Sequence, residues 1–335
     1  MIRRTILSIV CAGGMIWSAI GHWSEAAELT DELKEVRGQI VYESHREGNW
    51  DLFVCNADGS NSRNLTQTPT VDELYPKVSP DGTRICFLAD EGTGKEKVRN
   101  VYYMLRDGTQ RQLVARNGRD PCWSPDGTRI AYLPGEFEQY TLKDFASRGL
   151  SIFDLATGKS SPHPNLDLHH LYNLCWSADG NWFVATVHGG MGFQHAIIAF
   201  EAKGKRVVNL NIPGCRPDLS SDGKHIAWGA SDFALRAAEI DWSGPRVVGA
   251  HDLITSDKPI EVYHIDWSGD GRHITFSRGP SHKSLGAPPE MIGATADGWD
   301  ICVAATDAPN RMLQITHDGK GNKEPDWLPA GATNK

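Results

Sequence analysis

Five stretches of the chain alternate apolar and polar positions with a period of two. The first reads TRICFLA (83–89), in which the apolar residues Ile85 and Phe87 lie two positions apart. Successive side chains of an extended strand point to opposite faces, so this period predicts a β-strand with one buried face. The same spacing recurs in TRIAYLP (128–134), NWFVATV (181–187), KHIAWGA (224–230) and RHITFSR (272–278).

A Ser-x-Asp-Gly motif precedes each of these runs, and its aspartates lie 45, 53, 43 and 48 residues apart. A repeat of about 40–50 residues is typical of a propeller or a solenoid. Asp-Gly between two strands predicts a tight hairpin turn, because glycine accepts a positive φ without a steric cost. We therefore interpret the serine and aspartate as turn residues and not as a catalytic pair. The copies are VSPDG (78–82), WSPDG (123–127), WSADG (176–180), LSSDG (219–223), WSGDG (267–271) and a degenerate WLPAG (327–331).

Two further strands complete each unit. An apolar segment such as VRNVYYML (98–105) is followed by a second glycine turn, RDGTQ (106–110), and a fourth strand, RQLVA (111–115). The chain enters with GQIVYES (38–44), a second-strand pattern, and its last repeat, EPDWLPAG (324–331), is a first strand alone. Four antiparallel strands make a propeller blade. We therefore predict an all-β, six-bladed propeller, closed by pairing of the C-terminal strand with the N-terminal three strands.

These residues also carry a family resemblance. GNWDLFVCNADGSNSRNLTQTP (48–69) followed by PKVSPDGTRICFLAD (76–90) resembles the TolB-like, WD-type propeller repeat of exported bacterial proteins, and the resemblance extends over 38–331. It implies a six-bladed propeller in a periplasmic or extracytoplasmic setting. TolB proper also has a smaller α/β domain ahead of its propeller, which we expect to be absent here. The fold alone does not fix a function, because one fold hosts many.

The first residues have the form of a secretory signal peptide. Two arginines precede an uncharged, mostly apolar stretch at 5–21, and small residues follow as possible cleavage sites. This stretch is shorter than the roughly 20 residues of a spanning helix, so we expect cleavage and no membrane span afterwards. The predicted organisation is a signal peptide at 1–26, a short segment at 27–37, the propeller at 38–331 and a tail at 332–335.

The composition argues against some classes of binding partner. The chain has 335 residues and a formal net charge of −8. An acidic balance argues against sequence-independent nucleic-acid binding, which needs a basic surface. Apart from Cys11, the six cysteines form no CxxC pair and mostly lie in apolar strand patterns, so we expect buried thiols. We expect a soluble monomer with no nucleic-acid partner.

Strand direction divides the connections between two faces. Turns between first and second strands, and between third and fourth strands, are short and share one face. The other connections are long and share the opposite face, where binding loops usually lie on a rigid scaffold. First strands are innermost and begin on this long-loop face, so the residue six before each repeat aspartate should recur around the channel mouth. We predict a ligand-binding ring there, formed by Tyr75, Asp120, Asn173, Arg216, His264 and Glu324.

Two functions fit this picture. The first is an exported, non-catalytic binding or scaffold propeller that recognises an envelope protein or a glycan at the channel mouth. The second is a metal-assisted lyase or hydrolase acting on acidic oligosaccharides. EVYHIDWSGDGRHITFSRGP (261–280) is similar to a blade of the oligogalacturonate lyase propellers, which implies a divalent metal such as manganese held largely by histidine. We favour the binding module, with no catalytic residue and no cofactor. The weak metal-ligand candidates are His169, His170, His188 and His264.

Overall fold

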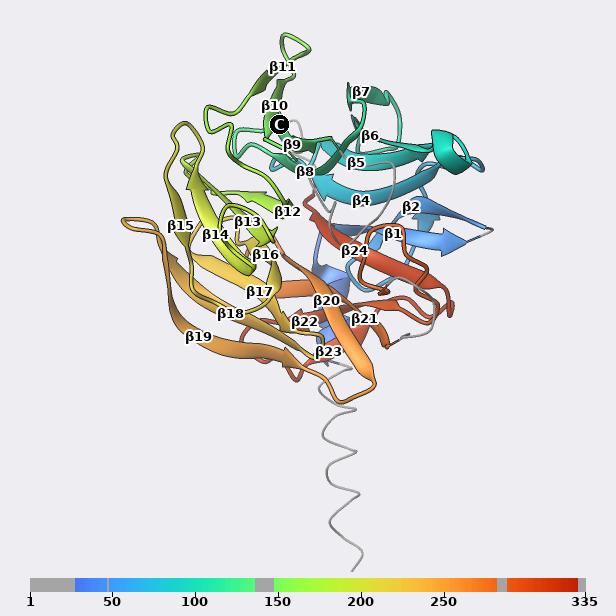
Figure 1. Ribbon diagram of the computed structural model, residues 1–335. Helices are drawn as coiled ribbons and strands as arrows, with labels where there is room; N and C mark the ends of the chain where they lie inside the picture. Colours follow the sequence, from blue (N-terminus) through green and yellow to red (C-terminus); the bar gives the residue numbers. More distant parts are fainter. Residues whose placement is uncertain (1–27, 47, 136–147, 282–287, 331–335) are drawn as a thin grey trace, which may run out of the picture.

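Six four-stranded antiparallel sheets surround a central axis in the computed structural model, which describes residues 28–46, 48–135, 148–281 and 288–330 (Figure 1). This is the predicted six-bladed propeller. In five blades the four strands follow one another in the sequence, and in the remaining blade a strand from the C-terminal end joins three from the N-terminal end. The predicted leader and the C-terminal tail lie outside the described residues.

Each blade is named here from its innermost strand outward. The first blade contains β24 (Gly321–Leu328), β1 (Gln39–Arg46), β2 (Asn49–Asn56) and β3 (Arg63–Asn64). The second contains β4 (Asp72–Val78), β5 (Arg84–Glu91), β6 (Val98–Leu105) and β7 (Gln112–Ala115). The third contains β8 (Gly118–Trp123), β9 (Arg129–Pro134), β10 (Ser151–Asp154) and β11 (Lys159–Pro162).

The other three blades continue around the axis. The fourth contains β12 (Leu171–Trp176), β13 (Trp182–His188), β14 (His195–Glu201) and β15 (Val207–Asn209). The fifth contains β16 (Cys215–Leu219), β17 (His225–Ser231), β18 (Ala234–Asp241) and β19 (Arg246–Thr255). The sixth contains β20 (Ile260–Trp267), β21 (His273–Pro280), β22 (Asp300–Ala305) and β23 (Met312–Gln314).

The first blade closes the ring as predicted. β24 pairs antiparallel with β1, with Gln39 opposite Leu328 and His45 opposite Gly321. The strand that comes last in the sequence is thus the innermost strand of the blade that comes first. Closure in this way leaves no unpaired inner strand at the seam of the ring.

The Ser-x-Asp-Gly motif is a hydrogen-bonded turn. In the first copy, Ser79 Oγ donates to Asp81 Oδ1 at 2.6 Å and accepts from the Arg84 backbone N–H at 2.9 Å. The Thr83 backbone N–H donates to the same Asp81 oxygen at 3.0 Å. These bonds hold the carboxylate in its charged form and lower the pKa of Asp81, against the effect of its partial burial. The serine–aspartate bond recurs in the other four complete copies, so the motif is architectural.

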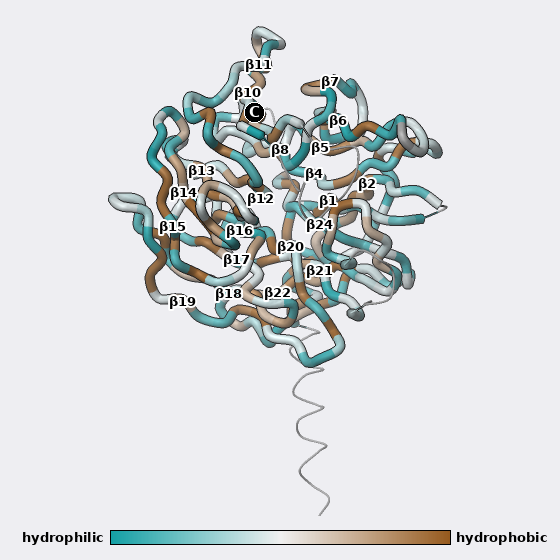
Figure 2. The backbone as a smooth tube through the Cα atoms, in the orientation of Figure 1, coloured by the Kyte–Doolittle hydropathy of each residue, from teal (hydrophilic) through white to brown (hydrophobic). Residues whose placement is uncertain are grey.

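Apolar residues are distributed over all six blades (Figure 2). The tryptophan before a turn packs between neighbouring blades, as Trp123 shows by donating its indole N–H to the Lys77 carbonyl at 2.8 Å. No disulfide joins the six cysteines of the described chain, of which four are buried and two are partly buried. Within the described ranges, no helix is long and apolar enough to cross a membrane.

A helix at 28–35 joins the first and last blades, where the sequence had suggested only a short connecting segment. Leu29 and Leu33 are fully buried in a cluster that includes Phe53 from β2, Ile301 from β22 and residues of β1 and β24. Glu32, on the same helix, accepts hydrogen bonds from Nε2 of His273 at 3.0 Å and from Arg311 at 2.8 Å. The spacing of four between the leucines was the sequence signal for this helix.

Candidate functional site

A cavity of about 330 Å³ runs along the axis between the six innermost strands. These strands are β4, β8, β12, β16, β20 and β24, which surround the centre of the disc in Figure 1. Backbones with the same orientation in every blade present equivalent positions to the cavity, so the repeat converts sequence positions into rings of side chains. Two such rings determine the chemistry of the channel.

The first ring contains the six residues predicted from the repeat. Each has a positive φ, between 46° and 57°, and the pairing of each inner strand with its neighbour shifts register around it. A β-bulge of this kind bends the strand and re-aims the side chain that it carries. The left-handed region of φ is unfavourable for residues other than glycine. Because all six ring residues adopt it, the fold imposes this backbone conformation at each of these positions.

Five of the six ring residues line the cavity, namely Tyr75, Asn173, Arg216, His264 and Glu324. Asp120 does not. It is fully buried, and its carboxylate accepts hydrogen bonds from the Asn173 backbone N–H at 2.9 Å and from Arg119 at 2.6 Å. Asp120 therefore binds the inner strand of the neighbouring blade instead of facing the channel.

Three of these residues interact with one another on one side of the channel. Glu324 Oε1 lies 3.1 Å from His264 Nε2 and 3.5 Å from an Arg216 nitrogen. Burial raises the pKa of Glu324 to about 7, although Arg216 acts in the opposite direction. Burial, followed by the charges of Arg216 and Lys323, keeps the pKa of His264 well below its usual range, so this imidazole is neutral at pH 7.

Residues 288–298 lie over the long-loop end of the channel. The buried ammonium of Lys323 donates to the carbonyls of Pro289, Met291 and Ala294 at 2.9, 2.8 and 3.0 Å. His264 Nε2 also lies 2.9 Å from the Glu290 carbonyl. A buried ammonium with three carbonyl partners is strongly localised, so this loop is firmly held at the end where the sequence placed the mouth.

The opposite end of the cavity reaches the short-turn face. Its lining there comes from the Ser-x-Asp-Gly turns and includes Pro80, Pro125, Ala178, Ser221 and Gly269. Among the described residues, the lining contains none from the long loops. The described lining of the channel therefore extends to the face of the short turns.

A second ring lies two residues further along each inner strand, and sequence reasoning did not single it out. Asp326 forms an ion pair with Lys77 at 3.6 Å, and Asp266 accepts from the Trp327 backbone N–H at 2.7 Å. Within the described chain, Asp218 Oδ2 has no hydrogen-bond partner. The alignment of the repeats already contained the signal, at the position four before each aspartate. The ring consists of Lys77, Cys122, Cys175, Asp218, Asp266 and Asp326.

Burial and mutual repulsion govern the carboxyl groups of this second ring. Burial raises the pKa of Asp218 to about 7, with the Lys77 ammonium opposing and Asp326 adding to the shift. For Asp266, burial and then the charges of Asp326 and Asp218 raise the pKa well above the usual aspartate range. A cation that enters the channel would relieve this repulsion.

The four predicted metal-ligand residues do not form one site, because His264 lines the channel while the other three lie together at the fourth blade. Both ring nitrogens of His264 have partners, since Nδ1 lies 3.1 Å from Ser277 Oγ and Nε2 contacts Glu290 and Glu324. His169, His170 and His188 lie at the long-loop face of the fourth blade. In the part of the chain that the structure describes, no group of three or more His, Cys, Asp or Glu side chains is arranged to hold a metal ion.

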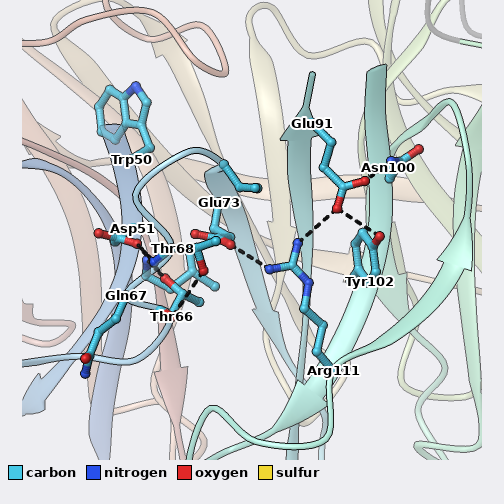
Figure 3. Close-up of polar contacts among 12 residues, drawn as sticks. Trp50, Asp51, Thr66, Gln67, Thr68, Glu73, Glu91, Asn100, Tyr102 and Arg111 are labelled. Atoms are coloured by element: carbon cyan, nitrogen blue, oxygen red, sulfur yellow. Dashed lines mark hydrogen bonds and ion pairs between the residues drawn. The ribbon is translucent and has the colours of Figure 1, made fainter. Parts of the chain in front are cut away.

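A second polar cluster lies in the second blade, beside Asp51 and Thr68 of the first blade (Figure 3). Glu73 is fully buried and accepts from Arg111 at 2.6 Å, while Arg111 also lies 3.6 Å from Glu91. Glu91 in turn accepts from Asn100 at 2.7 Å and Tyr102 at 2.9 Å. Burial raises the pKa of Glu73 to about 7. These groups bind one another and lie away from the channel, so we interpret the cluster as a link within the propeller wall.

Comparison with known proteins gives relatives over part of the sequence. No protein-family model matches the chain. A TolB homologue of Chlorobium luteolum is 29% identical over 173 residues, which are 39% of this chain and 38% of the homologue. A TolB homologue of Chlorobaculum tepidum is 33% identical over 113 residues, which are 33% of this chain and 23% of the homologue. The matches therefore span less than two fifths of the length of these relatives.

Solved structures share the fold. A putative TolB from Agrobacterium tumefaciens superposes with a TM-score of 0.54 at 16% identity, covering 85% of this chain and 90% of that one. A chain of a nidogen/laminin complex gives a TM-score of 0.58 at 6% identity, covering 88% and 99%. At such identities the likeness concerns the fold alone. The chain is thus a six-bladed β-propeller whose sequence is similar, over part of its length, to TolB homologues.

Proposed function

We propose that the protein is an exported binding propeller of the cell envelope, and that it takes a basic segment of a partner protein into its central channel. The ligand enters from the short-turn face, because the long-loop end of the channel is covered by 288–298. The observation that carries this proposal is the second ring, where three aspartates face one lysine in a cavity that solvent can enter.

The electrostatics of the channel favour a cationic ligand. The second ring places three carboxyl groups, those of Asp218, Asp266 and Asp326, beside the single ammonium of Lys77. Burial raises the pKa of all three carboxyl groups, so the binding of a cation would be coupled to the release of the protons that they hold. A lysine or arginine side chain placed among these carboxylates would form charge-assisted hydrogen bonds and would supply the partner that Asp218 Oδ2 lacks. The arginine, histidine and glutamate of the first ring are already paired, so they shape the inner end of the channel.

Two further features support the proposed envelope location and a binding function without catalysis. The arginine-led apolar stretch at the N-terminus has the form of an export signal, as expected for an envelope protein. In the channel, Glu324 binds Arg216 and His264, and Asp266 binds the backbone. Groups that are paired in this way suit recognition more than bond cleavage. A glycan ligand remains the alternative that the experiment distinguishes.

The test is a binding assay with short synthetic peptides of matched length and opposite charge, with neutral and acidic oligosaccharides as a second arm. We expect lysine- or arginine-containing peptides to bind, with an affinity that falls as salt is added. The double variant Asp218→Asn/Asp266→Asn should weaken binding at least about tenfold, or about 1.4 kcal/mol.

Asp252→Asn, at an exposed position of β19, is the matched control and should bind like the wild type. Melting temperatures of all variants establish that they fold. Preferential binding of acidic peptides or of glycans, or basic-peptide binding that is unchanged in the double variant, would refute the proposal.

A further inference from the structure

We propose that His188 and His195 form a surface site for a divalent transition-metal ion of the copper, nickel and zinc class. The two residues face each other in register across β13 and β14. Their rings are exposed, and their Nδ1 atoms lie 3.1 Å apart. The site is at the long-loop face, opposite the face where the channel opens, so it does not depend on the proposed peptide binding.

The distance between the two nitrogens allows both of them to bond to one metal ion. Nitrogen–metal bonds to histidine are about 2.0–2.1 Å long, so an ion bonded to both atoms would subtend an angle of about 98°. This value lies between the right angle of square-planar coordination and the tetrahedral angle. Because both rings are exposed, small side-chain rotations can direct the two lone pairs toward one ion.

A backbone carbonyl fixes the tautomer of His195. Its Nε2 lies 2.8 Å from the Gly214 carbonyl oxygen, which can only accept. The ring proton is therefore on Nε2, and Nδ1 accepts a hydrogen bond from His188 Nδ1–H. This arrangement is the carbonyl support that metal-bound histidines commonly have. A metal ion bonded to both Nδ1 atoms takes the place of that proton between the two rings, and neutral His188 then carries its proton on Nε2.

A glycine-rich turn at residues 189–194 joins the two histidines. It forms the connection between β13 and β14, and it packs closely on the preceding histidines. A Cβ at Gly190 would lie 2.7 Å from the His169 carbonyl and 2.8 Å from His170 Cβ. His169 accepts from the Met191 backbone N–H at 3.1 Å, and His170 Nδ1 contacts the His188 carbonyl at 3.1 Å.

The site supplies two protein ligands and leaves the remaining positions open. Within the described ranges, no third His, Cys, Asp or Glu side chain is arranged to complete the coordination. Water or a donor atom from another molecule would occupy the other positions. A site with two histidine ligands favours the ions that bind imidazole most strongly. The order of affinity should therefore be Cu²⁺ above Ni²⁺ above Co²⁺.

The test is calorimetric titration of the tag-free full chain with each of these metal ions alone, together with electron paramagnetic resonance of the Cu²⁺ form. We expect one Cu²⁺ per chain and hyperfine splitting from two nitrogens. His188→Ala and His195→Ala should each weaken binding at least about tenfold, or about 1.4 kcal/mol. Cu²⁺ should also raise the melting temperature of the wild type, since the ion joins β13 to β14.

His251→Ala is the matched control, because His251 is an exposed histidine on β19 and stands apart from this pair. It should bind Cu²⁺ like the wild type. All three variants should keep the melting temperature of the metal-free protein. Equal Cu²⁺ affinity in the wild type and in either single variant, or a spectrum with one coordinated nitrogen, would overturn the proposal.

Discussion

Single residues at the bulges determine what the channel presents. Tyr75, Asn173 and His264 belong to three different blades, yet each has a left-handed backbone and lines the same cavity. The fold sets the backbone at these positions and leaves the side chain free to vary, provided that it is polar enough for the channel. This separation allows one repeat to build a ring without symmetry, which is suited to an asymmetric ligand.

Another single residue, Glu73, makes stability depend on pH. Burial raises its pKa from the usual value of 4.5 to about 7, with Arg111 acting against the shift. The folded protein therefore holds this proton more tightly than the unfolded chain does. The contribution to stability is complete below about pH 4.5 and is lost as the pH rises through about 7.

Glu73→Gln should flatten this dependence. Glutamine does not titrate, so the free energy of unfolding should fall by about 1–3 kcal/mol less than in the wild type between pH 4.5 and 8. Denaturant titrations across this range measure the effect. Glu239→Gln, at an exposed position of β18, should keep the slope of the wild type. Identical slopes for the wild type and Glu73→Gln would show that the buried carboxyl does not titrate in this window.

At the scale of elements, the turn and its two strands behave as one unit. Ser177 is fully buried, donates to Asp179 at 2.6 Å and accepts from the Trp182 backbone N–H at 2.9 Å. Its hydroxyl thus bridges the turn to the start of β13. A nucleophile would need an exposed oxygen, and this buried hydroxyl instead binds the Asp179 carboxylate and the Trp182 backbone N–H.

Ser177→Ala should cost about 1–2 kcal/mol of stability, because two hydrogen bonds of a buried turn are lost. Ligand binding in the channel should be unchanged, since the cavity lining is untouched. Chemical denaturation and the peptide assay measure the two effects. A loss of binding larger than the loss of stability would give the motif a direct part in recognition.

The same elements show why prediction from the sequence succeeded in part. The period of two and the repeated turn specify strand, blade and ring closure, because each depends on contacts that recur in every copy. The covering of the long-loop end by residues 288–298 could not be predicted, since it depends on one buried side chain, Lys323, and three carbonyls from a segment that does not repeat. The positions of the second ring can be found by aligning the repeats. That their side chains meet in the channel became clear only from the structure, in which β24 pairs with β1.

At the scale of the whole molecule, the two faces of the disc have different roles. The long-loop face carries the firmly held segment 288–298 and the His188–His195 pair. The channel lining reaches the short-turn face, where we propose that the ligand enters. A ligand and a metal ion could therefore be bound on opposite faces without competing for residues.

The most direct test of this account is the affinity of one basic peptide for two variants that block opposite ends of the channel. Ala178→Trp adds a large side chain beside the short-turn opening, and Thr295→Trp adds the same side chain to the loop over the other end. We predict that Ala178→Trp weakens binding at least about tenfold while Thr295→Trp binds like the wild type. Unchanged binding by Ala178→Trp, with loss in Thr295→Trp, would contradict entry through the short-turn face.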